Sequence, residues 1–182
     1  MGKNIFSIII ISFVLLISCN NYKQKNERAI KITLSGWQRT IFAQKKASNS
    51  IKNNDVLILF KKINPLIYDE IIDSFNISDK KISEEDESLP KLEAKYKTEA
   101  IDRREEFIES EIKYRISRKE NTNLNKISLE GVISNIQKGI NHGSSLSPNS
   151  QFYWASKEIL LDYLNEIVSI EDDIIRQLKE LP

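Results

Sequence analysis

The chain has 182 residues and a formal net charge of +1 at neutral pH, with 27 Lys and Arg against 26 Asp and Glu. Its one cysteine and one histidine exclude an intrachain disulfide and are too few to build a zinc site. Glycine and proline are scarce, while Leu, Lys and Glu are frequent, which favours helices over an all-β fold. We therefore expect an all-α fold, a compact and partly irregular bundle of five or six helices in a single domain.

The first nineteen residues combine a short positive start with an apolar run. Lys3 supplies the charge, and residues 5–17 are apolar apart from Ser7 and Ser12. A helix over this run rises roughly 20 Å, short of a hydrocarbon core of about 30 Å, so the run is a poor membrane span. Its proportions are those of the apolar part of a secretory signal peptide. The single cysteine, Cys19, stands where the run gives way to polar residues.

The residues before Cys19 resemble the signal-peptide end of bacterial lipoproteins, in particular those of spirochaetes of the Borrelia type. Leu16 and the small residue Ser18 match the family's recognition box for signal peptidase, whereas Ile17 is bulkier than usual. The resemblance implies that residues 1–18 are a signal peptide and that Cys19 is lipidated. Residues 19–29 are then the lipidated cysteine with a short polar tether, and residues 30–182 form the helical domain. The implied location is the outer membrane, lipid-anchored and exposed at the cell surface.

Three helices are expected in the first half of the domain. Helical spacing of apolar residues predicts one over residues 30–47, although residues 30–34 also alternate as an extended segment does. Asn54 and its neighbours predict a cap for a second helix, and residues 56–60 are apolar on every side, so we expect a buried helix or, alternatively, a core strand. Asn64 and Pro65 begin a third helix, which reaches about Phe75.

The second half is predicted to alternate helices and loops. The acidic residues 76–89 indicate a solvated loop, and without a central glycine they do not fit a calcium loop. A long helix is expected over residues 89–119, then a break over residues 120–126 and a short helix capped by Ser128 that ends near Gly139 and Gly143. After a loop over residues 141–150, residues 150–180 give the strongest helical pattern. This last helix is the expected spine of the bundle, or alternatively a seam for a homodimer.

Charge is unevenly distributed along the chain. Residues 20–64 hold ten basic residues against Glu27 and Asp55, while residues 65–182 are acidic on balance. One interpretation places residues 30–64 toward the membrane, with the long acidic helices pointing outward, or gives the basic part a polyanion ligand. The simpler interpretation, which we favour, is that the basic and acidic parts pair with each other.

No catalytic constellation stands out in the sequence. His142 lies in a Gly- and Ser-rich loop without a nucleophile elbow, and Glu158 and Asp162 are spaced like an ordinary solvated pair on a helix. No phosphate-binding or dinucleotide motif occurs. We therefore expect neither enzymatic activity nor a metal, a cofactor or a nucleic-acid partner.

One aromatic cluster is a candidate for binding. Phe152, Tyr153 and Trp154 are adjacent at the start of the last helix, and aromatic residues are enriched in binding hot spots, although core packing is the commoner role. Together with the implied anchor, this predicts an interaction module for an extracellular macromolecule, such as a host protein. The alternative is a structural or assembly lipoprotein that faces the periplasm.

Overall fold

The structure is a computed structural model that describes the backbone of residues 2–137 and 148–182 and the side chains of residues 21–129, 131 and 151–182. Within these residues it contains helices and no strand, so the predicted all-α fold is confirmed. Residues 30–34 and 56–60, for which a strand was an alternative, are both helical. The helices are α1 (Gly2–Lys52), α2 (Asp55–Ile63), α3 (Pro65–Ser74), α4 (Asp79–Arg103), α5 (Glu106–Gln137) and α6 (Pro148–Lys179).

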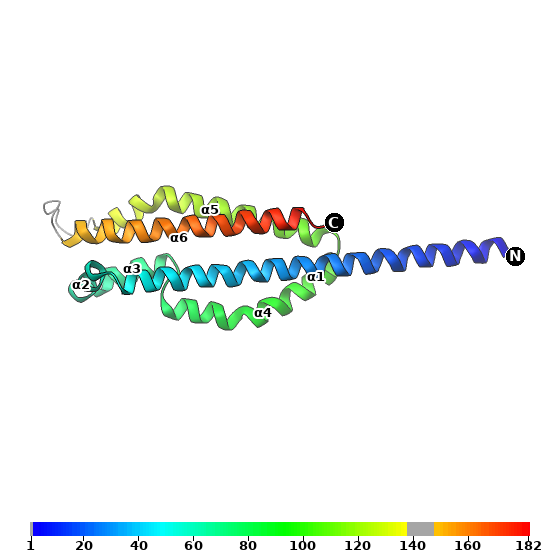
Figure 1. Cartoon of the computed structure of the whole chain (residues 1–182), viewed down its shortest axis with the longest axis horizontal. Coiled ribbons are helices and arrows are strands. Elements are labelled where there is room, and N and C mark those ends of the chain that lie inside the picture. Colours follow the sequence, from blue (N-terminus) through cyan, green and yellow to red (C-terminus); the bar gives the residue numbers. More distant parts are fainter. Residues whose placement is uncertain (1, 138–147) are drawn as a thin grey trace.

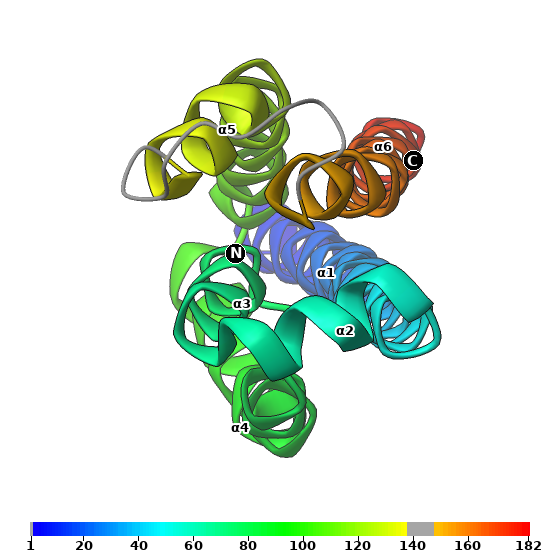
Figure 2. The same cartoon turned by 90° about the vertical axis from the view of Figure 1, so that its left-hand side faces the viewer.

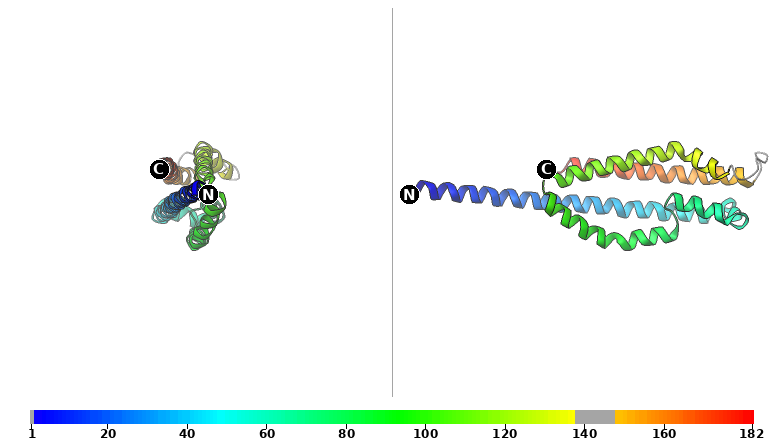
Figure 3. Two further views of the ribbon diagram at one scale, coloured as in Figure 1. Left: turned by 90° about the vertical axis from the view of Figure 1, so that its right-hand side faces the viewer. Right: turned by 180° about the vertical axis from the view of Figure 1, so that it is seen from behind.

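Four long helices build an elongated bundle, with α2 and α3 at one end (Figure 1). Helix α1 packs against α4 on one side and α6 on the other, and α6 packs against α5. The view along the bundle in Figure 2 separates these pairs, with α5 and α6 above and α4 below α1. The N-terminal part of α1 extends beyond the other helices, at the end where the C-terminus lies (Figure 3). The end of the bundle nearer residue 20 is called proximal below, and the end with α2 and α3 is called distal.

Two features of the N-terminal region differ from what the sequence suggests. Residues 20–28, expected to form a short polar tether, are helical within α1, and Asn26 and Ala29 are buried against the bundle. Residues 30–64 do not gather at the proximal end. They run along the whole bundle, and their last helix, α2, lies at the distal end (Figure 1).

Ion pairs join the basic part of the chain to the acidic part, as the simpler charge interpretation predicts. Four basic side chains of α1 bind carboxylates that lie far away in the sequence. These pairs are Arg39–Asp173, Lys45–Asp86, Lys46–Glu166 and Lys52–Asp79. Exposed ion pairs of this kind contribute about 0–1 kcal/mol each to the free energy of unfolding. They therefore make the charges on the facing helices complementary but add little stability.

Helix α2 is capped as predicted but is buried on only one side. The Asn54 side chain accepts hydrogen bonds from the backbone N–H groups of Val56 and Leu57, at 3.1 and 3.2 Å. Phe60 is buried with Leu57, whereas Ile58 and Leu59 are exposed. The expectation of burial on every side is therefore wrong, because α2 covers the end of the bundle instead of passing through it.

The acidic stretch predicted as a loop is mostly the start of α4. Helix α3 ends at Ser74. Asn76, two residues further on, has a left-handed φ of 56°, and the N–H of Ile77 donates to the Ile72 carbonyl at 3.2 Å. This is a Schellman motif, in which Asn76 takes the left-handed position that glycine usually occupies. The side chain of Ile77, the next residue, is fully buried. The side chain of Ser78 then caps α4. The acidic residues 84–87 lie within α4. This helix exposes most of its surface to solvent, so it needs few apolar residues.

The boundary between α4 and α5 also differs from the prediction. The expected helix over residues 89–119 is interrupted at Arg104, which has a left-handed φ of 41°. The expected break at residues 120–126 is absent, because α5 continues to Gln137, and Ser128 lies inside it rather than at its start. Helix α4 itself contains Pro90 and is visibly bent (Figure 1), as proline inside a helix causes. The predicted ends at Gly139 and Gly143 lie outside the described residues.

The last helix is confirmed as the spine of the bundle. Helix α6 spans Pro148–Lys179, and its apolar positions Leu160, Ile167, Ile170 and Ile174 are buried in the common core. Helices α1 and α5 of the same chain cover this face. The apolar seam that was considered for a homodimer is thus used inside the molecule.

Candidate functional site

A buried ionic cluster lies at the centre of the bundle, and we call it the Arg115 cluster. Its members are Trp37 of α1, Glu111, Arg115 and Arg118 of α5, and Glu171 of α6. The side chains of Arg115 and Glu171 are completely buried, and Glu111 is nearly so. Full burial of charges is costly unless they are paired, so the hydrogen bonds of this cluster decide whether it can exist.

Each charge in the Arg115 cluster has a partner. The Nε atom of Arg115 donates to Glu111 at 2.8 Å and its Nη1 atom to Glu171 at 3.2 Å. Its Nη2 atom donates to the backbone carbonyl of Thr33 at 3.3 Å. The other oxygen of Glu171 lies 3.2 Å from Nε of Arg118. Two guanidinium groups thus face two carboxylates, and the cluster has no net charge.

Trp37 covers the cluster from α1. The guanidinium groups of Arg118 and Arg115 lie 4.0 and 5.0 Å from the centre of its ring, which is cation–π geometry. The Trp37 Nε1–H donates to the hydroxyl of Tyr96 on α4 at 3.1 Å. Burial raises the pKa of Tyr96 to about 12, so this hydroxyl stays neutral. All four long helices therefore meet at this cluster, and it acts as an internal connection rather than as an accessible reactive site.

A close approach of two helices makes room for Arg115. Gly36 of α1 is buried, and a Cβ atom at this position would lie 2.9 Å from Cγ1 of Ile174 and 3.4 Å from Nη1 of Arg115. A Cβ atom here would force Ile174 to shift, so packing favours glycine at position 36. The same absence of a side chain lets Arg115 reach the carbonyl of Thr33, one turn earlier on α1.

A small polar cavity of about 150 Å³ adjoins the cluster. Trp37, Gln44, Arg118 and Tyr163 contribute to its walls. Gln44 Oε1 and Arg118 Nη1 are buried without a hydrogen-bond partner. Burial raises the pKa of Tyr163 to about 12, which keeps its hydroxyl neutral. A polar space of this size is suited to a few ordered water molecules.

The structure separates the three candidate aromatic residues. Phe152 is buried, and its ring stacks on that of Phe60 with centroids 3.8 Å apart and planes inclined by 16°. Trp154 is 61% exposed, and the half-buried Tyr153 meets its ring edge-on at 5.0 Å. Phe152 therefore fastens α2 to α6, and only Trp154 presents most of its surface to solvent.

Further apolar side chains are exposed at the same end of the bundle as Trp154. Leu59 and Ile63 of α2 are 55% and 59% exposed, and Leu66 of α3 is 81% exposed. Figure 1 shows α2, α3 and the start of α6 together at the distal end. We call Leu59, Ile63, Leu66 and Trp154 the distal surface. Exposed large apolar side chains gathered in one region are typical of interaction sites.

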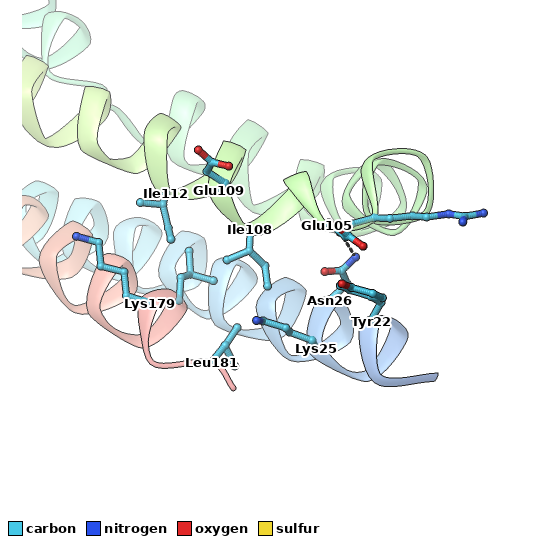
Figure 4. Close-up of a pocket in the computed structure, with 11 residues that line it drawn as sticks. Tyr22, Lys25, Asn26, Glu105, Ile108, Glu109, Ile112, Lys179 and Leu181 are labelled. Carbon is cyan, nitrogen blue, oxygen red and sulfur yellow. Dashed lines mark hydrogen bonds between the residues drawn. The ribbon is translucent and has the colours of Figure 1, made fainter. Parts of the chain in front are cut away.

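Two pockets flank α1 at the proximal end. The smaller pocket, of about 270 Å³, lies among α1, the start of α5 and the end of α6, with Lys25, Ile108 and Leu181 in its wall (Figure 4). The larger one, of about 800 Å³, lies between α1 and α4, and we call it the proximal groove. Its walls include Tyr22, Asn26, Ile30 and Leu34 of α1 and Ala100 and Ile101 of α4.

Asn26 fixes the shared wall of these pockets. Its Nδ2 atom donates to the backbone carbonyls of Ala100 and Arg104, at 2.9 and 2.8 Å. The second bond holds the left-handed end of α4 against α1. The Tyr22 hydroxyl bonds to Glu105, and this hydrogen bond raises the pKa of Tyr22. The residues after Cys19 are thus part of the folded domain.

The remaining predicted site residues lie as follows. Leu16, Ser18 and Cys19 fall within the backbone of α1, and His142 lies outside the described residues. Glu158 and Asp162 are exposed on α6. In the described part of the chain no three His, Cys, Asp or Glu side chains are grouped as metal ligands would be. Among the residues whose side chains the structure describes, which begin at residue 21, no helix is both long and apolar enough to cross a membrane.

The fold and these sites define an all-α helical bundle with a central ionic cluster. Comparison of the chain with protein-family models, with curated proteins and with solved structures gave no match. Its functional interpretation therefore depends on its own residues.

Proposed function

We propose that the protein is a lipid-anchored lipoprotein of the outer surface that binds an extracellular macromolecule through its distal surface. The observation that carries the proposal is the placement of two features at opposite ends of one long bundle. Cys19, with the lipoprotein-like residues before it, belongs to the proximal end, and the four side chains of the distal surface lie at the other end. A bundle anchored at Cys19 holds the distal surface away from the membrane.

The distal surface has the composition of a binding surface. Trp154 is a large aromatic residue, the type most often found in hot spots, and Leu59, Ile63 and Leu66 add exposed apolar area at the same end of the bundle. The stacked rings of Phe60 and Phe152 hold α2 on α6, the two helices that carry Leu59, Ile63 and Trp154. The surface is therefore carried by a fixed support, which reduces the entropy lost on binding.

Protease treatment of intact cells tests the location. For an outer-surface protein, proteinase K removes the domain from intact cells while a periplasmic marker survives. Survival of the domain until the envelope is broken contradicts surface display and supports the alternative, a structural or assembly lipoprotein that faces the periplasm.

Binding to purified serum and matrix proteins, measured by biolayer interferometry, tests the distal surface. Leu66→Asp and Trp154→Ala are expected to weaken any saturable interaction at least about tenfold, since hot-spot residues contribute roughly 2 kcal/mol or more. Ile101→Asp is the matched control, because Ile101 is 71% exposed but lies at the proximal end. Equal binding by all three variants and the native protein excludes the distal surface as the binding site.

A further inference from the structure

The proximal groove combines apolar walls with charged edges. Ile30, Leu34 and Ala100 line it, and Ile101 lies on it with 71% of its surface exposed. Charged residues of both signs line it as well, namely Lys23, Lys31, Lys97 and Arg104 with Glu27, Glu93 and Glu105. Long basic side chains cover apolar surface with their methylene stems while their charged ends stay in water. The groove is thus suited to a narrow apolar ligand that enters along its length.

The register of α1 connects the groove to Cys19. Position 19 precedes Lys23, Asn26 and Ile30 by 4, 7 and 11 residues, which are the spacings of one helical face. All three of these residues line the groove. Tyr22, the first groove residue, follows position 19 within a single helical turn. Position 19 therefore lies one helical turn before the mouth of the groove, in the same helical register as these groove residues.

The dimensions of the groove match an acyl chain. Tyr22 and Leu34 are twelve positions apart, which is about 18 Å along an α-helix. One leaflet of acyl chains fills half of a hydrocarbon core of about 30 Å, so an extended chain spans about 15 Å. A cavity of about 800 Å³ gives such a chain room beside the side chains that already line it.

We propose that the proximal groove takes up one fatty acyl chain carried by Cys19 of the same molecule. This inference rests on the proposed function, because it requires lipidation of Cys19. Covalent attachment one turn before the mouth of the groove gives the chain a high effective concentration there, so an intramolecular ligand is favoured over a free one. A chain in the groove is shielded from water while the protein is outside a bilayer, and the remaining chain or chains stay available for the membrane.

Photo-crosslinking of the native lipidated protein tests the groove. Cells are grown with a palmitate analogue that carries a terminal diazirine, and the protein is purified and irradiated in detergent below its critical micelle concentration. Mass spectrometry of the N-terminal peptide first establishes acylation of Cys19. The acyl chain is then expected to crosslink to residues 26–34 and 93–101. Mixing with isotopically heavy, unlabelled protein shows whether each crosslink is intramolecular, and crosslinks to heavy peptides overturn the proposal.

A matched pair of variants separates groove binding from nonspecific contact. Ile101→Asp places a charge on the groove wall at an exposed position. It is expected to reduce the groove crosslinks about tenfold, since the acyl chain loses apolar contact equal to the burial of roughly two methylene groups. Leu66→Asp makes the same change at the distal end and leaves them unchanged. If Cys19 is acylated but no groove crosslinks form, or if Ile101→Asp does not reduce them, then the acyl chain does not bind in the groove. The proposed function survives either result. A Cys19 without acyl chains overturns the proposed function together with it.

Discussion

Arg115 of α5 and Glu171 of α6 form an ion pair at 3.2 Å in which neither side chain is exposed to solvent. Burial lowers the pKa of Arg115, but attraction by Glu171 and Glu111 outweighs this effect and raises it overall. The guanidinium group also reaches a carbonyl of α1, so one side chain links three helices. The register of the bundle depends on this connection, because a shift of any of these helices would leave a buried charge without its partner.

Removal of the Glu171 charge is expected to destabilise the fold strongly. Glu171→Gln leaves two guanidinium groups facing the single carboxylate of Glu111, and we expect a loss of about 3 kcal/mol in the free energy of unfolding. Asp172→Asn is the matched control, since Asp172 is the next residue and forms an exposed ion pair with Lys119. Its expected cost is below about 1 kcal/mol. Urea unfolding compares the two variants, and equal costs contradict a structural role for the buried cluster.

The same glycine-to-alanine change is expected to act in opposite directions at two helical positions. Gly36→Ala gains about 1 kcal/mol of helix propensity but pushes against Ile174 at 2.9 Å, and overpacking costs about 1–3 kcal/mol. Its net effect is a destabilisation of up to about 2 kcal/mol. Gly131→Ala meets no atom within 4 Å and should stabilise α5 by up to about 1 kcal/mol. Thermal unfolding followed by circular dichroism measures both, and stabilisation by Gly36→Ala disagrees with the close approach of α1 and α6.

Asn26 is expected to control the order of the first turns after Cys19. Asn26→Ala removes both hydrogen bonds to the end of α4 and leaves two carbonyls without their partner, at a cost of about 1–3 kcal/mol. Amide hydrogen exchange in residues 22–30 should become faster than in the native protein. Asn21→Ala, at an exposed position, is the control and should change little. Unchanged exchange in the Asn26 variant means that these residues are held by other contacts.

Acid is expected to weaken the contact between α1 and α6. Hydrogen bonds from Arg39, Arg176 and Gln177 lower the pKa of Asp173 below its ordinary value of 3.8. A carboxyl group with a lowered folded-state pKa stabilises the fold above its unfolded pKa, and this contribution is lost as the pH falls through the folded value. The free energy of unfolding of Asp173→Asn should therefore fall less between pH 7 and pH 3 than that of the native protein. A fall as steep as that of the native protein contradicts a stabilising role of the Asp173 carboxylate.

Much of the fold can be predicted from local sequence. The Asn54 cap and the spacing of Leu160, Ile167 and Ile174 use interactions within one helix or one helical face, and the structure confirms them. The boundary of α4 and α5 cannot be predicted in this way, because Asn26, distant in sequence, holds the chain at Arg104. The acidic start of α4 has the sequence of a loop, because an exposed helix needs little apolar surface.

The Arg115 cluster was missed although the sequence carries a signal for it. Glu171 stands among Ile167, Ile170 and Ile174 on the apolar face of α6, and a charge at such a position requires a buried partner. Glu111 and Arg115 are spaced as a helical ion pair, which is also common on surfaces. Sequence alone does not show whether this pair is buried or exposed, because its burial depends on Gly36, which brings α1 close to α6.

The most direct test of the account is the mass of the N-terminal peptide of the protein isolated from its cells. Lipid anchoring predicts a chain that begins at Cys19 and carries the mass of two or three acyl chains. It also predicts that Cys19→Ala is released as a soluble folded domain or accumulates as an uncleaved precursor. A chain that begins at Met1, or a Cys19 with an unmodified thiol and amine, contradicts the anchor, and with it the orientation that places the distal surface outward.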